Sequence, residues 1–157
     1  MILVTVGTQL PFERLLRAVH AITTGTHIEV IAQSHSIPAW DTHMQCFASL
    51  PPDALDEYFS RAEAIVSHAG VGSIISARRA GKPIIIYPRL SKLGEHRNDH
   101  QLATARQLGS ETGIHVAWDE SDLRELIHSR SELSCSNGLG PEHETLISNL
   151  KTLIKAA

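Results

Sequence analysis

The stretch Ala64-Ile65-Val66-Ser67-His68-Ala69-Gly70-Val71-Gly72-Ser73 decides the fold. Its first four residues form a short apolar run, which is typical of a buried strand in a parallel sheet. The glycines that follow predict a turn, and the residues from about Gly72 to Ala80 predict a helix. Gly81 comes just past that helix, at the position where glycine commonly ends helices. A strand, a glycine-bearing turn and a helix in this order predict one βα unit of an α/β protein.

The same alternation of strands and helices continues along the chain. Apolar runs predict further strands at residues 2–6, 28–32, 45–48, 83–87 and 114–117. An apolar stripe predicts a helix over residues 12–22, and Pro51-Pro52-Asp53 predicts the start of a second helix. Asn98 and Asp119 are predicted to cap the starts of two further helices. A polar hinge at residues 134–140 precedes a last helix from about Pro141. We therefore expect a single domain over residues 1–157, a Rossmann-like parallel sheet with helices on both faces.

The composition argues against several classes of protein. The chain has 157 residues, of which 42% are hydrophobic and 20% charged, as in ordinary globular domains. A net charge of −3 and only 4% aromatic residues argue against a nucleic-acid partner. Cys46 and Cys135 have neither metal-binding nor redox spacing, which predicts free thiols in a reducing compartment. The apolar run at residues 1–6 is too short for a signal peptide or a membrane span, so we expect a cytoplasmic protein.

Ligands of parallel α/β sheets bind at the edge where the strands end and the helices begin. The predicted strands place three segments at that edge. These are Gly7-Thr8 after the first strand, the turn at residues 68–73, and the loop after Tyr87.

The turn at residues 68–73 has the features of an anion site. Gly70 and Gly72 let the backbone approach a ligand, and the following helix offers free amides and the positive end of its dipole. Ser73 has a hydroxyl donor, and His68 can donate a hydrogen bond to a phosphate oxygen. A glycine turn that serves packing alone is an equal alternative. The turn matches neither GxGxxG nor GxxxxGK[ST], which disfavours a dinucleotide enzyme and a nucleotide triphosphatase.

Three segments carry a resemblance to a known family. The turn His68-Ala69-Gly70-Val71-Gly72-Ser73 resembles the donor-binding motif of GT-B glycosyltransferases. The longer segment of residues 67–83 that contains this turn, together with residues 4–8 and 94–101, resembles glycosyltransferase family 28, C-terminal type. That family includes the catalytic subunit of the two-subunit transferase that adds the second GlcNAc to dolichol diphosphate, and bacterial exopolysaccharide glucuronosyltransferase subunits.

The resemblance implies that the chain binds a UDP-sugar. The implied donor-binding residues are Gly7, Thr8, His68, Ala69, Gly70, Val71, Gly72, Ser73, Glu95, His96, Asp99, His100 and Gln101. Among these, the turn at residues 68–73 would hold the diphosphate, and residues 99–101 would contact the hydroxyls of the donor sugar. Ser76 departs from the pattern, because many GT-B enzymes have a glutamate there that holds the ribose. Glu95 is the candidate substitute.

The resemblance also implies what completes the enzyme. GT-B donor sites lie between two domains, and this chain supplies one of them. We therefore expect a membrane-associated partner subunit that binds a lipid-linked oligosaccharide acceptor and contributes the catalytic base, so no catalytic residue is assigned here. The final helix, residues 141–157, is the expected docking element. The expected donor carries GlcA or GlcNAc, and the design requires no metal or other cofactor.

Other interpretations stay open. A non-catalytic UDP-sugar-binding regulator, a UDP-sugar epimerase fragment and a structural domain without a ligand are all compatible with the fold. His96 and His100 are four residues apart, but two histidines without an HExxH pattern do not predict a zinc site. Arg78 and Arg79 are expected on a solvated helix face. Three basic residues of one loop either balance diphosphate charge or solvate the loop: Arg89, Lys92 and Arg97.

Overall fold

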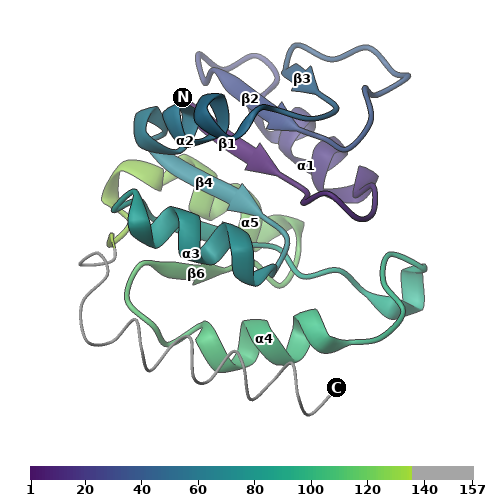
Figure 1. Ribbon diagram of the computed structural model, residues 1–157, viewed down its shortest axis with the longest axis vertical. Coiled ribbons are helices and arrows are strands. Elements are labelled where there is room, and N and C mark those ends of the chain that lie inside the picture. The colour runs from purple at the N-terminus through teal and green to yellow at the C-terminus, as the bar shows by residue number, and fades with distance from the viewer. Residues whose placement is uncertain (136–157) are drawn as a thin grey trace.

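The structure is a computed structural model and describes residues 1–135. These residues form one sheet of parallel strands in the order β3-β2-β1-β4-β5-β6 (Figure 1). The strands are β1 (Ile2–Thr5), β2 (Val30–Gln33), β3 (Gln45–Phe47), β4 (Ala64–Ser67), β5 (Ile84–Ile86) and β6 (Ile114–Val116). The helices are α1 (Glu13–Thr23), α2 (Pro52–Arg61), α3 (Val71–Arg79), α4 (His100–Leu108) and α5 (Glu120–His128), with short 3-10 turns η1 (Ser91–Leu93) and η2 (Arg130–Glu132). The predicted Rossmann-like α/β fold is confirmed.

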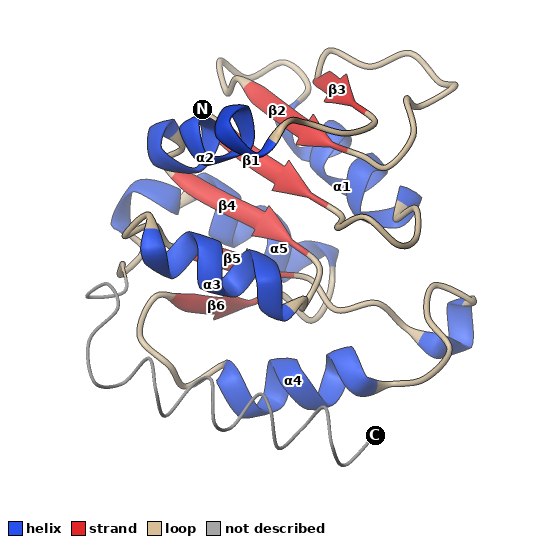
Figure 2. Cartoon of the chain, viewed as in Figure 1, coloured by secondary structure: helices blue, strands red, loops and turns tan. Residues whose placement is uncertain are grey.

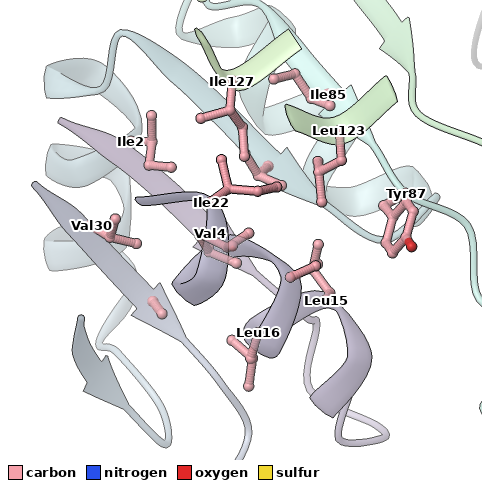
Figure 3. Packing of buried hydrophobic residues seen from close by; sticks show 14 of the residues in the cluster. Ile2, Val4, Leu15, Leu16, Ile22, Val30, Ile85, Tyr87, Leu123 and Ile127 are labelled. Carbon is pink, nitrogen blue, oxygen red and sulfur yellow. The ribbon is translucent and has the colours of Figure 1, made fainter. Parts of the chain in front are cut away.

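Helices cover both faces of the sheet (Figure 2). Successive strand residues point to opposite faces, so each strand contributes to two separate cores. On one face, Leu3 and Ile65 pack with residues of α2, α3 and α4. On the other face, Ile2 and Val4 pack with residues of α1 and α5, as Figure 3 shows from close by. Burial on both faces explains why the strands are continuous apolar runs rather than alternating ones.

The central strands end at one level. Thr5 of β1 pairs with Gln33 of β2 on one side and with Ser67 of β4 on the other. Ser67 pairs in turn with Ile86 of β5. The loops that leave these strands therefore gather on one edge of the sheet, which we call the carboxyl edge.

Two predicted helix caps have different outcomes. Asp119 caps α5 as expected, because its carboxylate accepts a hydrogen bond from the backbone N–H of Asp122 at 2.9 Å. The cap of α4 is Asp99 rather than Asn98, and α4 begins at His100. The Asp99 carboxylate does not bond the helix, because it accepts hydrogen bonds from the backbone and the hydroxyl of Ser91 instead.

The expectation that Arg78 lies on a solvated face is wrong. Arg78 is only 3% exposed, and its guanidinium lies 3.1 Å from a carboxylate oxygen of Glu111. Glu111 follows α4, so this ion pair joins α3 to the end of α4. Arg79, the next residue, is exposed as predicted.

Few large apolar side chains are exposed in residues 1–135. Those that are exposed follow a strand on the carboxyl edge: Leu10 after β1, Ile37 after β2, Leu93 after β5 and Trp118 after β6. No helix within the described range is both long and apolar enough to span a membrane. The expected last helix, residues 141–157, and most of the hinge before it lie outside the described residues.

Candidate donor-binding site

A cavity of about 450 Å³ opens on the carboxyl edge of the sheet. Nine of the expected donor-binding residues line it: Gly7, Thr8, His68, Gly70, Val71, Gly72, Ser73, His96 and Gln101. They come from the loop after β1, the turn between β4 and α3, the loop after β5 and the start of α4. The fold therefore brings segments that are far apart in sequence around one cavity.

Four of the expected residues do not line this cavity. Ala69 is 4% exposed and packs in the core beneath α3. Glu95 forms an ion pair with Arg14, with its carboxylate oxygen 2.7 Å from Nε. The carboxylate of Asp99 is engaged by Ser91, and His100 lies outside the cavity wall. The suggested use of Glu95 in place of the ribose-binding glutamate therefore has no support in the geometry.

The imidazole of His68 lies between two glycines. A β-carbon added at Gly7 would lie 2.8 Å from Cε1 of His68, and one added at Gly70 would overlap Nε2. Gly7 also has φ +76, a left-handed conformation that favours glycine. In this structure the space left by Gly70 is filled by the imidazole rather than left for a ligand. Gly72 differs, because nothing lies within 4 Å of an added β-carbon there.

Burial makes His68 a neutral imidazole at physiological pH. The pKa of His68 falls from 6.5 to about 4, mainly because of burial and next because of the nearby positive charge of Arg89. A hydrogen bond with the backbone of Thr5 opposes the shift, and His96 adds a small effect in the direction of burial. His68 therefore carries no charge of its own when the cavity is empty.

The hydrogen-bond network assigns the proton of His68 to Nδ1. The hydroxyl of Ser67 donates to the backbone carbonyl of Thr5 at 2.9 Å, so its oxygen is left to accept. Nδ1 of His68 lies 3.3 Å from that oxygen and is therefore the donor. Nε2 then holds a lone pair in the free protein. The sequence predicts that His68 donates a hydrogen bond to a phosphate oxygen. To do so through Nε2, His68 must take up a second proton.

Helix α3 presents its amino end to the cavity. It begins at Val71, and its N-cap Gly70 has no side chain to satisfy the first amides. Val71, Gly72 and Ser73 all line the cavity. Unpaired amides and the dipole of a helix at its amino end favour an anion by about 0.3–1 kcal/mol when exposed and up to ~2 kcal/mol when partly buried.

Arg89 is buried beneath the cavity and joins two of its loops. Its side chain is 2% exposed, and its guanidinium donates to the backbone carbonyls of Val6, Leu10 and Pro11 at 2.9, 2.7 and 2.6 Å. The guanidinium does not solvate its loop, and both of its terminal nitrogens already donate to backbone carbonyls. Its charge still acts on the cavity, since Arg89 forms part of the wall. Lys92 and Arg97 are exposed.

Gln101 is held in place by the same loop. It lies in the first turn of α4, is 8% exposed, and accepts a hydrogen bond at Oε1 from the backbone N–H of Arg89 at 3.0 Å. The amide nitrogen of Gln101 is the atom left for a ligand. This residue therefore serves both the loop after β5 and the cavity wall.

The cavity also has lining residues that the sequence analysis did not single out. They are Thr5, Val6, Gln9, Leu10, Gln33, Leu55 and Phe59. Thr5 and Gln33 are the last residues of β1 and β2, so the rule that ligands bind at strand ends could have found them. For Leu55 and Phe59, the sequence predicted only that they belong to the apolar stripe of a helix. Ser76 lines the cavity as well, although it is far shorter than a glutamate.

No three His, Cys, Asp or Glu side chains within residues 1–135 come close enough to hold a metal ion. The polar part of the cavity wall is made of backbone amides, hydroxyls, side-chain amides and the histidines His68 and His96, with the charge of Arg89 behind it. Such groups are suited to an uncharged or anionic ligand with many hydrogen-bonding oxygens.

The parallel sheet and the cavity at its carboxyl edge define an α/β domain of the Rossmann-like class. The chain belongs to glycosyltransferase family 28, since the family's C-terminal domain matches residues 1–136. It is therefore a glycosyltransferase domain.

Solved structures share this fold. An NMR solution structure of ALG13 has a TM-score of 0.63 and 20% identity, covering 92% of this chain and 93% of that one. The glycosyltransferase of kitacinnamycin has a TM-score of 0.63 and 17% identity, and MurG of Acinetobacter baumannii has 0.59 and 17%. This chain spans 39% and 42% of those two proteins. No curated protein sequence matches the chain.

Proposed function

We propose that this chain is the donor-binding subunit of a two-component glycosyltransferase that uses a UDP-sugar. The donor would carry GlcA or GlcNAc, and the acceptor would be a lipid-linked sugar used in polysaccharide synthesis. The observation that carries the proposal is the cavity at the turn between β4 and α3, where a helix end, Ser73 and His68 meet. The family assignment supports a transferase, and the cavity wall supports an anionic donor.

In the proposed reaction, an acceptor hydroxyl attacks the anomeric carbon of the sugar, and UDP leaves with the bonding electrons. Negative charge then grows on the diphosphate. The amides of Val71, Gly72 and Ser73 at the start of α3 would offset that charge. Arg89 would add a positive charge from behind the wall, and His68 would add one after taking up a proton. These groups act by electrostatic stabilisation and form no covalent bond with the sugar.

The proposal assigns the catalytic base to a partner. The histidines that line the cavity are His68 and His96, and His68 is held between two glycines. The partner would also bring the acceptor and close the carboxyl edge. Four large apolar side chains are exposed in the loops that follow strands on that edge: Leu10, Ile37, Leu93 and Trp118.

A non-catalytic UDP-sugar-binding regulator is the second candidate, and one observation favours it. Ser76 lines the cavity at the position where the family resemblance implies a glutamate for the ribose. A serine offers a shorter and uncharged contact, which fits a site that binds without turnover. The epimerase interpretation is not supported by the family assignment, which is to a glycosyltransferase.

The first test is calorimetric titration of the chain with UDP, UDP-glucuronate and UDP-GlcNAc. A His68→Ala variant should lose affinity for all three, because it removes part of the cavity wall. His27→Ala is the matched control, since His27 is exposed and does not line the cavity. Equal binding by both variants would contradict the placement of the diphosphate. Absence of binding by the native chain, with and without a partner subunit, would contradict the donor-site proposal.

Transfer of radiolabelled sugar to a lipid-linked acceptor separates the enzyme from the regulator. Cell membranes that contain the partner should support transfer only when this chain is added. UDP binding without transfer under those conditions would favour the regulator.

A further inference from the structure

One buried polar group in the cavity wall has no partner. Gln33, the last residue of β2, is 4% exposed, and its Oε1 is buried without a hydrogen-bond partner in the described structure. The backbone of Gln33 is well paired, because its carbonyl accepts from the N–H of Val6 at 3.1 Å. A buried amide oxygen without a partner costs about 1–3 kcal/mol, so such groups in native proteins call for an explanation.

The neighbours of Gln33 make its end of the cavity mostly apolar. Gln33 is two residues beyond Ile31 on β2, so both side chains point to the face covered by α2. Ile31 packs there in one cluster with Phe59, and Leu55 packs against the same cluster. Leu55 and Phe59 also line the cavity. An apolar wall with one amide suits a flat heterocyclic ring better than it suits a sugar, whose many hydroxyls need many partners.

The strand order places this wall on one side of the phosphate turn. Along the carboxyl edge, β2 with Gln33 lies between β3 and β1, and β1 is followed by β4 with the turn at residues 68–73 and then by β5. Gln101 lies beyond that turn, at the start of α4, which follows β5. A nucleotide-sugar has its diphosphate in the middle and its nucleoside and sugar at opposite ends. With the diphosphate at the turn, one end of the donor reaches the β2 side and the other reaches Gln101.

We propose that Gln33 binds the pyrimidine ring of the donor nucleotide through its side-chain amide. The amide offers one acceptor and one donor side by side, and the imide edge of uracil offers an N–H donor beside a carbonyl acceptor. The last torsion of a glutamine is broad and two-fold, so a half-turn exchanges Oε1 and Nε2 without changing the shape of the side chain. The ring lies against Leu55 and Phe59, and the sugar lies on the Gln101 side. This inference rests on the proposed function.

The test compares UDP with inorganic pyrophosphate, which lacks the nucleoside. We expect Gln33→Met to weaken UDP roughly tenfold, the loss typical of a ligand group left without its partner, and to leave pyrophosphate unchanged. Met fills a similar volume without an orphaned oxygen, so the melting temperature of the free protein should rise by roughly 3 °C. Gln33→Asn keeps the amide but withdraws it by one carbon, and should weaken UDP alone. Gln107→Met, at an exposed position of α4, is the matched control.

Each other outcome overturns the inference. Unchanged UDP affinity in Gln33→Met and Gln33→Asn would show that the amide does not touch the nucleotide. Equal weakening of UDP and pyrophosphate would show that Gln33 shapes the whole cavity rather than the nucleoside end. A Met variant that unfolds would show that the amide serves the sheet. Failure of the proposed function looks different, because the native chain itself would then not bind UDP.

Discussion

Gly70 leaves the space that the imidazole of His68 fills, since a β-carbon at Gly70 would overlap Nε2 of the histidine. Gly70 has an ordinary negative φ of −94, so this glycine is required by the contact and not by its backbone conformation. We expect Gly70→Ala to displace His68 and to lower the free energy of unfolding by roughly 1–3 kcal/mol, as other overpacked sites do. Urea denaturation measures the change.

Gly72→Ala is the control for that substitution. Gly72 lies in the first turn of α3, and nothing is within 4 Å of an added β-carbon. Alanine favours helix over glycine by up to about 1 kcal/mol, so this variant should be as stable as the native chain or more so. A Gly70→Ala variant of native stability would mean that the imidazole moves aside at little cost.

The depressed pKa of His68 makes stability depend on pH. The pKa of His68 is about 4 in the folded chain against 6.5 for an ordinary histidine, so the unfolded chain takes up a proton first as pH falls. Stability is therefore complete above about pH 6.5 and declines towards pH 4, by about 3 kcal/mol for a shift of this size. His68→Gln does not titrate, so its unfolding free energy should fall less over the same range. Parallel pH profiles for the two proteins would contradict this prediction.

Ligand binding should raise the pKa of His68 and so promote protonation of its imidazole. A bound diphosphate places negative charge beside the imidazole, and negative charge raises the pKa of a histidine. Binding of UDP-GlcNAc should therefore take up part of a proton near pH 6 and become tighter as pH is lowered from 7 towards 5. Calorimetry in two buffers with different ionisation enthalpies counts the protons. The His68→Gln variant should show no such uptake.

Arg89 should be among the most sensitive positions for stability. Arg89→Met would leave the carbonyls of Val6, Leu10 and Pro11 without their donor in the interior. We expect a loss of about 3–5 kcal/mol, the usual range for removal of one side of a buried charged network. Arg79→Met is the control, since Arg79 is exposed on α3 and its loss should change stability by less than about 0.5 kcal/mol. Chemical denaturation of the two variants would show no difference if the Arg89 contacts were unimportant.

The order of strands and helices was predictable because its signals are local. The apolar run at residues 64–67 and the glycines after it lie next to each other in the chain, and they specify a buried strand and a turn without any distant partner. The cavity position followed from one general rule about strand ends.

Residues whose role depends on distant partners were not predictable in this way. Arg89 bonds the carbonyls of residues that precede it by 78 to 83 positions, and no periodicity reports such contacts. The sequence around Arg78 is that of a surface residue, and only the folded structure shows its ion pair with Glu111. Gln33 was left out because the predicted strand ended at residue 32, one residue before the strand reaches the cavity.

The exposed apolar side chains of the carboxyl edge make the two ends of the described part of the molecule different in polarity. Leu10, Ile37, Leu93 and Trp118 all follow strand ends, so the large apolar side chains exposed within residues 1–135 lie at one end of the axis of the strands. On an oily support, a plastic plate or the air–water film of a microscopy grid, the protein should settle with this edge downwards. Its cavity would then face the support, and adsorbed protein would be folded but closed to its ligand.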